Sequence, residues 1–260
     1  MCAFAHVKIY CITNKEILTI EECMPDSKHI IVVGATGGIG SVLAREFVSA
    51  GHRVTLSSRT EKKLLDLSQL LGNDRTFVVS GDASNPLDVK RLFDSAQKKF
   101  GSIDAVVMAS GTWDRVSIDD SIASAMSILD THYRGLFAAT FVVGFIAQQF
   151  LREQGSGLIV NISSHAAVKP ELLGNLTYGP MKAAERHLIL SLHGELKGTN
   201  VRVTDLEPAI VYTSDTASLL DTAEKKACAV QPEDIAKWIL DNLVNPDIPA
   251  THLFESSVVL

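Results

Sequence analysis

Two residues four positions apart, Tyr178 and Lys182, have the types and the spacing for acid–base chemistry. Side chains at this spacing lie on one face of a helix, so the Lys182 ammonium can sit beside the Tyr178 phenol. A free phenol titrates near pH 10, and lowering its pKa to about 7 requires roughly 4 kcal/mol of preferential stabilisation of the phenolate. A neighbouring ammonium in a dry cleft supplies much of that energy. Tyr178 would then act as an acid and base for the interconversion of an alcohol and a ketone.

A serine fourteen residues before Tyr178 belongs to the same predicted site. The apolar run 158–162 predicts a strand, and Ser163 and Ser164 follow it directly. There, a Ser164 hydroxyl can donate to a substrate carbonyl and hold it near the phenol, provided that loop 165–177 folds back over the sheet. The alternative is a serine pair that only forms a turn.

A glycine-rich turn near the start of the chain predicts a phosphate-binding loop. The apolar run 30–33 stops at Gly34, and Gly37, Gly38 and Gly40 follow before a helical pattern begins. Free N–H groups and the positive end of the helix dipole meet there, so a dinucleotide pyrophosphate can dock. A purely structural strand–helix turn is the alternative. No Gly-Lys-Ser/Thr follows the glycines, which excludes a P-loop.

The residues after the next two predicted strands bear on which dinucleotide binds. Strand 53–57 is followed by Ser58 and Arg59, at the position that faces the adenosine ribose. No carboxylate is present there to bind the 2′-hydroxyl of NAD, whereas the forked donors of Arg59 suit the 2′-phosphate of NADP. The alternative is a solvated arginine that opens a helix. Asp82, after strand 76–80, either accepts a hydrogen bond from the adenine amino group or caps a turn.

The elements that must position these residues alternate between strand and helix from residue 29 to about 243. Fully apolar strands between helices predict an α/β fold with a doubly wound parallel sheet covered on both faces. No linker divides the pattern, so we expect a single domain at 29–260 after an extension at 1–28 that is either a hairpin or a tail. The predicted strands are 30–33, 53–57, 76–80, 105–108, 158–162 and 201–206, and the predicted helices are 41–50, 61–71, 86–100, 124–150, 179–197 and 232–242.

The composition of the 260 residues narrows the class of protein. A net charge of −6 argues against nucleic acid and anionic membrane surfaces as main partners. The most apolar stretch, 136–147, is shorter than the roughly 20 residues that cross a bilayer, so we expect a buried helix. Four cysteines without a CxxC pair predict neither a zinc site nor a disulfide framework, and residues 1–28 lack a secretory signal pattern. We therefore expect a cytoplasmic protein without a metal.

Several motifs in register make residues 29–245 resemble the short-chain dehydrogenase/reductase family. They are Gly34-xxx-Gly38-x-Gly40, Arg59, Asp82, Asn161-Ile-Ser-Ser164, Tyr178-xxx-Lys182 and Pro208-Ala-Ile-Val-Tyr-Thr213. The resemblance implies a Rossmann-type three-layer α/β/α sandwich that binds NADP(H). In it, Ser164 orients the substrate carbonyl, Tyr178 transfers the proton, and Lys182 binds the nicotinamide ribose and lowers the pKa of Tyr178. The implied cofactor contacts are Gly34, Thr36, Gly37, Gly38, Ile39, Gly40, Ser58, Arg59, Asp82, Ala83, Ser110, Gly111, Tyr178, Lys182, Pro208, Ala209 and Thr213.

The chain also departs from the family pattern. Met108-Ala-Ser-Gly111 stands where the family has Asn-Asn-Ala-Gly, so two amides that brace the cofactor loop are missing. His132 stands where the family has an asparagine that positions a water of the proton relay. We hypothesise that His132 is a catalytic residue that tunes this relay. The alternative is a histidine satisfied by a backbone carbonyl.

The resemblance leaves the branch of the family and the activity to be weighed. Gly37 also fits the Gly34-xx-Gly37-xx-Gly40 pattern of the extended branch, which includes sugar-nucleotide epimerases, but the short remainder after Lys197 favours the shorter branch. We expect an NADP(H)-dependent oxidoreductase that acts on a carbonyl or secondary alcohol. The alternatives are a catalytically silent NADP(H)-binding regulatory protein and an extended-type epimerase.

The resemblance and the apolar residues also predict how the chain associates and what lines its substrate pocket. Family members commonly associate through the helices that match 124–150 and 179–197, so we expect a homodimer or homotetramer. Phe137, Phe141 and Phe145 on one helix face fit that interface or an internal core. Residues 252–260 resemble members that lack the usual glycine-rich final strand. The predicted wall of the substrate pocket is mainly apolar and consists of Val168, Leu172, Leu173, Tyr212, Leu219 and Leu220.

Overall fold

The structure is a computed structural model, and it describes residues 10–13, 16–19, 27–169 and 175–256. Strands β1 (Tyr10–Thr13) and β2 (Glu16–Thr19) pair antiparallel, with Tyr10 opposite Thr19. They form a two-stranded sheet of their own within the expected N-terminal extension. Leu172 and Leu173, which we predicted to line the substrate pocket, lie outside the described residues.

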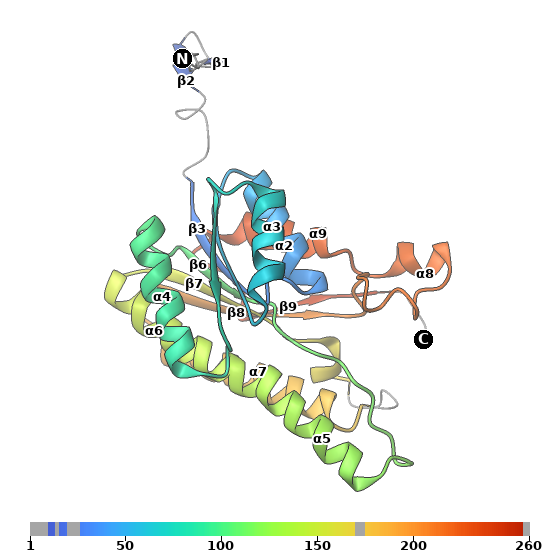
Figure 1. The fold of residues 1–260 in the computed structure, drawn as a ribbon. Coiled ribbons are helices and arrows are strands. Elements are labelled where there is room, and N and C mark those ends of the chain that lie inside the picture. The colour runs from blue at the N-terminus through green and yellow to red at the C-terminus, as the bar shows by residue number, and fades with distance from the viewer. Residues whose placement is uncertain (1–9, 14–15, 20–26, 170–174, 257–260) are drawn as a thin grey trace.

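A seven-stranded sheet forms the main body (Figure 1). Its order is β5-β4-β3-β6-β7-β8-β9, and every neighbouring pair is parallel. The chain builds from β3 to one edge and then returns to add β6 on the other side of β3, so the switch point lies between these two strands. Ligands of such sheets bind beyond the carboxyl ends of the strands at that point. The strands are β3 (His29–Val33), β4 (Arg53–Ser58), β5 (Thr76–Ser80), β6 (Ala105–Met108), β7 (Gly157–Ile162), β8 (Val201–Pro208) and β9 (Thr251–Phe254).

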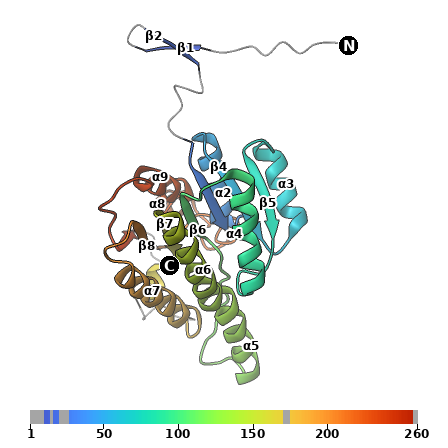
Figure 2. The same cartoon turned by 90° about the vertical axis from the view of Figure 1, so that its left-hand side faces the viewer.

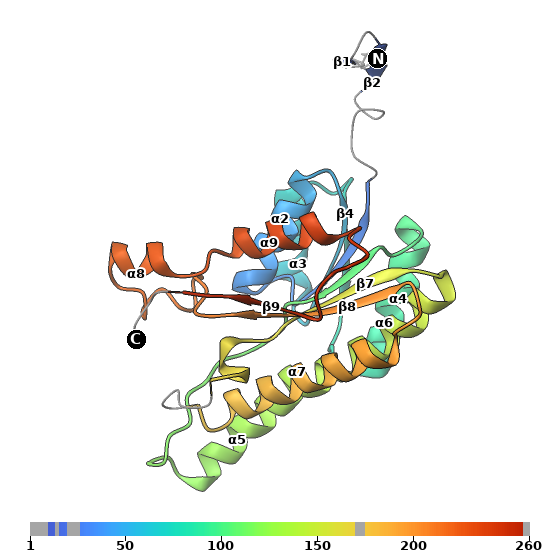
Figure 3. The ribbon, with the colours of Figure 1, turned by 180° about the vertical axis from the view of Figure 1, so that it is seen from behind.

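Helices cover both faces of the sheet, as Figure 2 and Figure 3 show from two sides. The first layer contains α2 (Gly38–Ser49), α3 (Glu61–Leu71) and α9 (Pro232–Asn242). The second layer contains α4 (Pro86–Phe100), α6 (Ala139–Gln154) and α7 (Tyr178–Glu195).

The strands pack against both layers at once. In β3, Ile30 and Val32 pack in the first layer, whereas Ile31 and Val33 pack in the second. Both faces of the central strands are therefore buried, which explains their continuous apolar sequences. The structure confirms the predicted α/β fold: a doubly wound parallel sheet in a three-layer sandwich that forms a single domain.

The predicted helix 124–150 is part of a longer helical run. It consists of α5 (Ile122–His132), the π-helical segment η1 (Tyr133–Ala138) and α6. By length and composition, the run Ile122–Gln154 could cross a membrane, which corrects our argument from the shorter stretch 136–147. Its inward side chains, among them Leu136 and Val143, are buried in the molecule, as core-helix packing requires. That packing accounts for much of its apolar character.

The C-terminal region differs from the prediction. The expectation that the chain lacks the final strand is wrong, because β9 pairs parallel with β8, with Asp205 opposite Thr251. This strand contains no glycine, which is why the family's glycine-rich pattern did not reveal it. A short helix, α8 (Ala223–Cys228), and the 3₁₀ turn η2 (His165–Ala167) were also not predicted.

Candidate functional site

Tyr178 and Lys182 meet at the start of α7, beside the carboxyl end of β7. The Lys182 ammonium nitrogen lies 5.9 Å from the centroid of the Tyr178 ring. It donates a hydrogen bond of 3.1 Å to the carbonyl of Ile162, the last residue of β7. Lys182 is buried and Tyr178 is half-buried. The structure therefore places both residues on one helix face, with the ammonium next to the Tyr178 ring.

The two serines after β7 point to different partners. Ser163 is buried and donates to Asp205 Oδ2 at 2.5 Å, away from solvent. Ser164 is half-buried, and its Oγ accepts a hydrogen bond of 3.1 Å from the Ala166 backbone at the start of η2. Within the described ranges, no acceptor takes the Ser164 hydroxyl hydrogen. Ser164 thus forms the turn that was the alternative, and its hydrogen is still free for a substrate oxygen.

His132 is buried beside Tyr178. Its ring meets the Tyr178 ring edge-on, with centroids 5.8 Å apart. Nε2 accepts from the Asp114 backbone N–H at 3.3 Å, so Nδ1 carries the hydrogen that bonds Thr177 Oγ1 at 3.0 Å. Burial and the nearby charge of Lys182 lower the pKa of His132, whereas the charge of Asp114 raises it. The net shift is downward, so the ring is neutral at pH 7. Among the described residues, no hydrogen bond joins His132 to Lys182, and the role of His132 in the relay stays a prediction.

A buried carboxylate that was not predicted, Glu185, lies directly behind Lys182. Its Oε2 is 2.8 Å from Lys182 Nζ, and the two side chains are 1% and 4% exposed. Thr140 donates a hydrogen bond of 3.2 Å to its other oxygen. Burial raises the pKa of Glu185, and the Lys182 charge opposes that rise. The only sequence signal is an acidic residue three positions after Lys182, on the face that the helix must bury.

A second buried carboxylate, Asp205, lies on β8 under the same helix. Asn161, opposite it in register, donates a hydrogen bond of 2.7 Å to Oδ1. Burial raises the pKa of Asp205 to about 7, although the bonds from Ser163 and Asn161 oppose the rise. The sequence signal is a carboxylate on the strand face of Val203, where alternation places interior residues.

The glycine turn has the shape and polarity for a pyrophosphate. Gly34 has φ +84°, and a Cβ there would lie 2.6 Å from the Ser110 backbone, so only glycine fits. Helix α2 begins at Gly38 with no side-chain cap and no acidic residue in its first turn, which includes Ile39 and Gly40. Its free N–H groups are open to an anion. A Cβ on Gly38 would lie 2.6 Å from Thr213 Cβ, so Thr213 sits over the turn.

The turn and the catalytic helix meet at Gly111. A Cβ on this residue would lie 3.9 Å from Lys182 Nζ and 3.3 Å from Leu136. Ser110 and Gly111 follow β6, and Ala209 follows Pro208, the last residue of β8, so these predicted contacts lie at the carboxyl ends of their strands. The structure therefore brings the glycine turn and the Tyr178–Lys182 pair to the same end of the sheet, where sheets of this kind hold ligands in a crevice.

Ser58 and Arg59, the residues that we predicted to bind at the 2′ position, lie at the end of β4. Thr36 donates a hydrogen bond of 3.1 Å to Ser58 Oγ, which joins the ends of β3 and β4. Arg59 is exposed next to it. The part of the chain that the structure describes offers the Arg59 guanidinium no ion pair or hydrogen bond. An exposed cation without a partner fits an anionic ligand, which the 2′-phosphate supplies.

A small hollow lies at the ends of β3, β4 and β5. Asp82 and Ala83 line it together with Val33, Ser57, Gly81, Asp88, Val89 and Leu92. Asp82 Oδ1 accepts from the Ser84 backbone at 2.9 Å and from its hydroxyl at 2.8 Å. Asp82 therefore caps its own turn, as the second alternative proposed. Its hydrogen bond with an adenine amino group stays a prediction.

Two loops contain the residues that we predicted to line the substrate pocket. Val116 pairs with Asn175 in an isolated parallel bridge, which joins the loop before α5 to the segment that enters α7. Val168 is 41% exposed, and Tyr212 and Leu219 are half-buried, whereas Leu220 is fully buried. Leu220 thus belongs to the core and not to the pocket wall. Among the described residues, no group of three or more His, Cys, Asp or Glu side chains could hold a metal ion.

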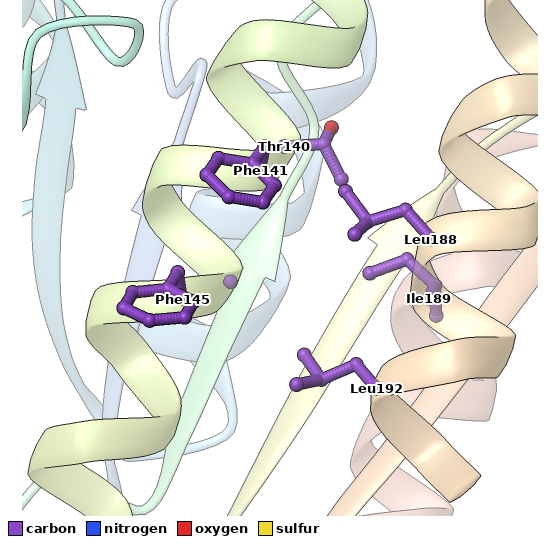
Figure 4. A pocket seen from close by; sticks show the side chains of 7 residues that line it. Thr140, Phe141, Phe145, Leu188, Ile189 and Leu192 are labelled. Carbon is purple, nitrogen blue, oxygen red and sulfur yellow. The ribbon is translucent and has the colours of Figure 1, made fainter. Parts of the chain in front are cut away.

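A different hollow lies outside the crevice, between α6 and α7 (Figure 4). The side chains of Thr140, Phe141, Phe145, Leu188, Ile189 and Leu192 face one another across it. Phe141 and Phe145 are 47% and 51% exposed, and their rings stack with centroids 5.8 Å apart. This hollow is apolar and lacks the groups that reaction chemistry requires.

Comparison with known proteins agrees with this geometry. A family model described as short chain dehydrogenase matches residues 28–224. An uncharacterized oxidoreductase of Staphylococcus aureus (strain USA300) is 31% identical over 84% of this chain and 92% of its own length. The NADP-dependent 3-hydroxy acid dehydrogenase YdfG of Shigella flexneri is 30% identical over 81% of this chain and 86% of its own. The structure of 7α-hydroxysteroid dehydrogenase with NADH and 7-oxo glycochenodeoxycholic acid has a TM-score of 0.78 at 24% identity, covering 89% of this chain and 93% of that one.

Proposed function

The chain belongs to the short-chain dehydrogenase family, and on that premise we propose that it is an NADP(H)-dependent oxidoreductase of carbonyls and secondary alcohols. Family membership makes it an oxidoreductase that acts on a small molecule. The cofactor type, the substrate class and the role of Tyr178 are the proposed parts. The observation that carries the role of Tyr178 is its position beside Lys182 on α7, with Lys182 next to Gly111.

The proposed chemistry assigns one task to each side chain. Bound nicotinamide supplies the hydride for reduction or accepts it in oxidation. Ser164 donates a hydrogen bond to the substrate carbonyl oxygen and holds it near Tyr178. The Tyr178 hydroxyl gives its proton to that oxygen as negative charge develops there, and Lys182 stabilises the phenolate until solvent returns a proton. Oxidation of an alcohol follows the same steps in reverse.

The residues at the crevice fit NADP(H). The N–H groups at the start of α2 would hold the pyrophosphate, Ser58 and Arg59 the 2′-phosphate, and Lys182 the nicotinamide ribose. The name of the Shigella relative specifies NADP, whereas the hydroxysteroid dehydrogenase structure holds NADH. The choice for this chain therefore rests on Arg59 and on the absence of a carboxylate at residue 58.

The cofactor preference can be measured with an Arg59→Ala variant. A charge-assisted hydrogen bond contributes about 1.5–3 kcal/mol, so we expect NADPH to bind about 10- to 100-fold more weakly and NADH to bind as before. The control is Arg45→Ala, because Arg45 is an exposed arginine paired with Glu233 at 2.8 Å. An unchanged ratio of the two dissociation constants in Arg59→Ala would remove Arg59 from the proposal.

The activity itself is tested by a screen of ketones, aldehydes, secondary alcohols and 3-hydroxy acids with NADP(H) and with NAD(H). We expect turnover with NADP(H) for at least one class. A catalytically silent NADP(H)-binding regulator is the second candidate, because the Met108–Gly111 turn lacks two family amides and His132 replaces the relay asparagine. Tight NADPH binding without turnover on any substrate would favour the regulator.

We also propose that the chain is a cytoplasmic homo-oligomer that associates through α6 and α7. The apolar hollow between these helices and the half-exposed rings of Phe141 and Phe145 support this face as the contact. An apolar surface of this kind favours burial against a second copy. Light scattering of the purified protein tests it, and a monomer at all concentrations would contradict it.

A further inference from the structure

The proposed mechanism uses the positive charge of Lys182, and the structure shows a carboxylate in contact with it. Glu185 lies one helical turn further along α7, with its carboxylate 2.8 Å from the ammonium. Lys182 is thereby held from two sides, by Glu185 and by the Ile162 carbonyl at 3.1 Å. An ion pair that is almost wholly buried interacts strongly, because little water is present to screen it.

Glu185 is itself fixed in place. Thr140 on α6 donates to its second oxygen at 3.2 Å, and Thr140 is only 3% exposed. A buried carboxylate is unfavourable unless it is paired and hydrogen-bonded, and Glu185 satisfies both conditions. The position of its negative charge relative to Lys182 and Tyr178 is therefore set by the packing of α6 against α7.

We propose that Glu185 is a positioning residue for the reaction, which holds the Lys182 ammonium in place and weakens the positive charge that Tyr178 experiences. This inference rests on the proposed function, because it assigns a role within the same acid–base site. Glu185 does not touch the substrate or the cofactor in this proposal. It acts through Lys182, and it sets the pH at which the Tyr178–Lys182 pair gives up its first proton.

The other ionisable groups around the pair do not replace Glu185. Asp205 on β8 faces Lys182 from the sheet, but its two oxygens are bonded to Asn161 and Ser163. Glu207, also on β8, is bonded to Arg186 Nε at 2.6 Å.

The remaining neighbours of the pair carry no charge that offsets Lys182. His132 at the end of α5 is neutral at pH 7, because burial lowers its pKa. From α6 and β7, the neighbours are the uncharged Thr140 and Asn161. Glu185 is thus the carboxylate in direct contact with Lys182 among the described residues.

The direction of the effect follows from linkage. A negative charge beside the pair stabilises its fully protonated form, so removing that charge makes the first proton leave at lower pH. At an effective dielectric constant near 20 and a separation of several ångströms, the expected shift is about one pH unit downward.

The test is a titration of the Tyr178 phenol by ultraviolet absorbance of tyrosinate, which needs neither substrate nor cofactor. The chain has four tyrosines, so the signal of Tyr178 is obtained by subtracting the titration of a Tyr178→Phe protein. The same subtraction is made in a Glu185→Gln background. Glu195→Gln, an exposed glutamate at the end of the same helix, is the matched control.

We expect the Tyr178 midpoint to fall by about one pH unit in Glu185→Gln and to stay unchanged in Glu195→Gln. An unchanged midpoint would overturn the proposal. A raised midpoint would also overturn it, because Glu185 would then act only by keeping Lys182 charged. If Asp205→Asn lowers the midpoint as much as Glu185→Gln does, the assignment to Glu185 is wrong.

Two further measurements keep the test decisive. If Glu185→Gln fails to fold, Glu185→Asp keeps the charge but withdraws it by one methylene, and a smaller shift in the same direction is expected. Where turnover is found, the pH profile of kcat/KM for alcohol oxidation should shift with the titration. A shifted titration in a protein without turnover would support the role of Glu185 and contradict the proposed function. Turnover that requires Tyr178, together with a titration that does not shift, would support the proposed function and contradict the role of Glu185.

Discussion

The two faces of the sheet bury their side chains in different ways. Under α2 and α9 the core is apolar, with Phe47, Leu206 and Ile235 fully buried. Under α7, the carboxyl-terminal parts of β7 and β8 instead meet a group of buried polar residues, which we call the polar seam. It consists of Asn161, Ser163, Lys182, Glu185, Asp205 and Glu207.

The difference shows which part of the core contains polar side chains in place of apolar packing. Buried charges lose hydration, and an apolar core of the same shape is often as stable or more stable. The polar seam ends at Lys182, which lies beside Tyr178 and next to Gly111, near the glycine turn. We therefore interpret the apolar face as the part that stabilises the fold and the polar seam as the part that tunes the site.

The largest effect on stability is expected on the apolar face. Phe47→Ala removes a fully buried ring from α2 and leaves a cavity, so the free energy of unfolding should fall by about 3–5 kcal/mol. Denaturant unfolding measures it, with Phe47→Leu as a control that should lose less. A loss below about 1 kcal/mol would show that this face is not the stabilising one.

The polar seam should make the free energy of unfolding depend on pH. The pKa of Asp205 is raised from 3.8 to about 7, chiefly by burial, so between these values the folded protein keeps a proton that the unfolded chain releases. The free energy of unfolding then falls as the pH rises through this window, by at most about 1.4 kcal/mol per pH unit. Asp205→Asn removes this contribution.

The measurement compares wild type and Asp205→Asn by denaturant unfolding at several pH values. Between about pH 4 and pH 7 the wild type should lose up to about 4 kcal/mol relative to the variant. The pKa of His29 is lowered to about 4, mainly by burial, so His29 makes the free energy of unfolding rise with pH in the same range. This contribution is the same in wild type and variant, and it cancels when the two curves are subtracted. Parallel curves would mean that Asp205 ionises normally in the folded protein.

The smallest effect is expected for an ion pair at the surface. Lys90 and Asp94 on α4 are 2.7 Å apart, close to the separation in the Lys182–Glu185 pair, but they are 63% and 51% exposed. Solvent screens such a pair, so Asp94→Asn should change the free energy of unfolding by less than about 0.5 kcal/mol. A loss above about 1 kcal/mol would weaken the contrast between the buried seam and the surface.

The apolar face and the glycine turn could be predicted from the sequence, whereas the polar seam could not. The strand at Ile30–Val33 and the turn at Gly34 depend on local patterns: an apolar run and a backbone that only glycine allows. Helix and strand periodicity place Glu185 and Asp205 on inward faces, but these side chains become neighbours of Lys182 only when α7 packs on β8, which no local pattern shows. Strand β9 was missed for the same reason, because its pairing with β8 and not its composition makes it a strand.

The most direct test of the proposed acid–base role compares Tyr178→Phe with wild type, in turnover of the best substrate and in NADPH binding. The substitution removes only the phenol hydroxyl, so turnover should fall by about a thousandfold while the NADPH dissociation constant stays nearly unchanged. Turnover close to that of wild type in Tyr178→Phe would contradict the assignment of Tyr178 and, with it, the mechanism built on Lys182 and Ser164.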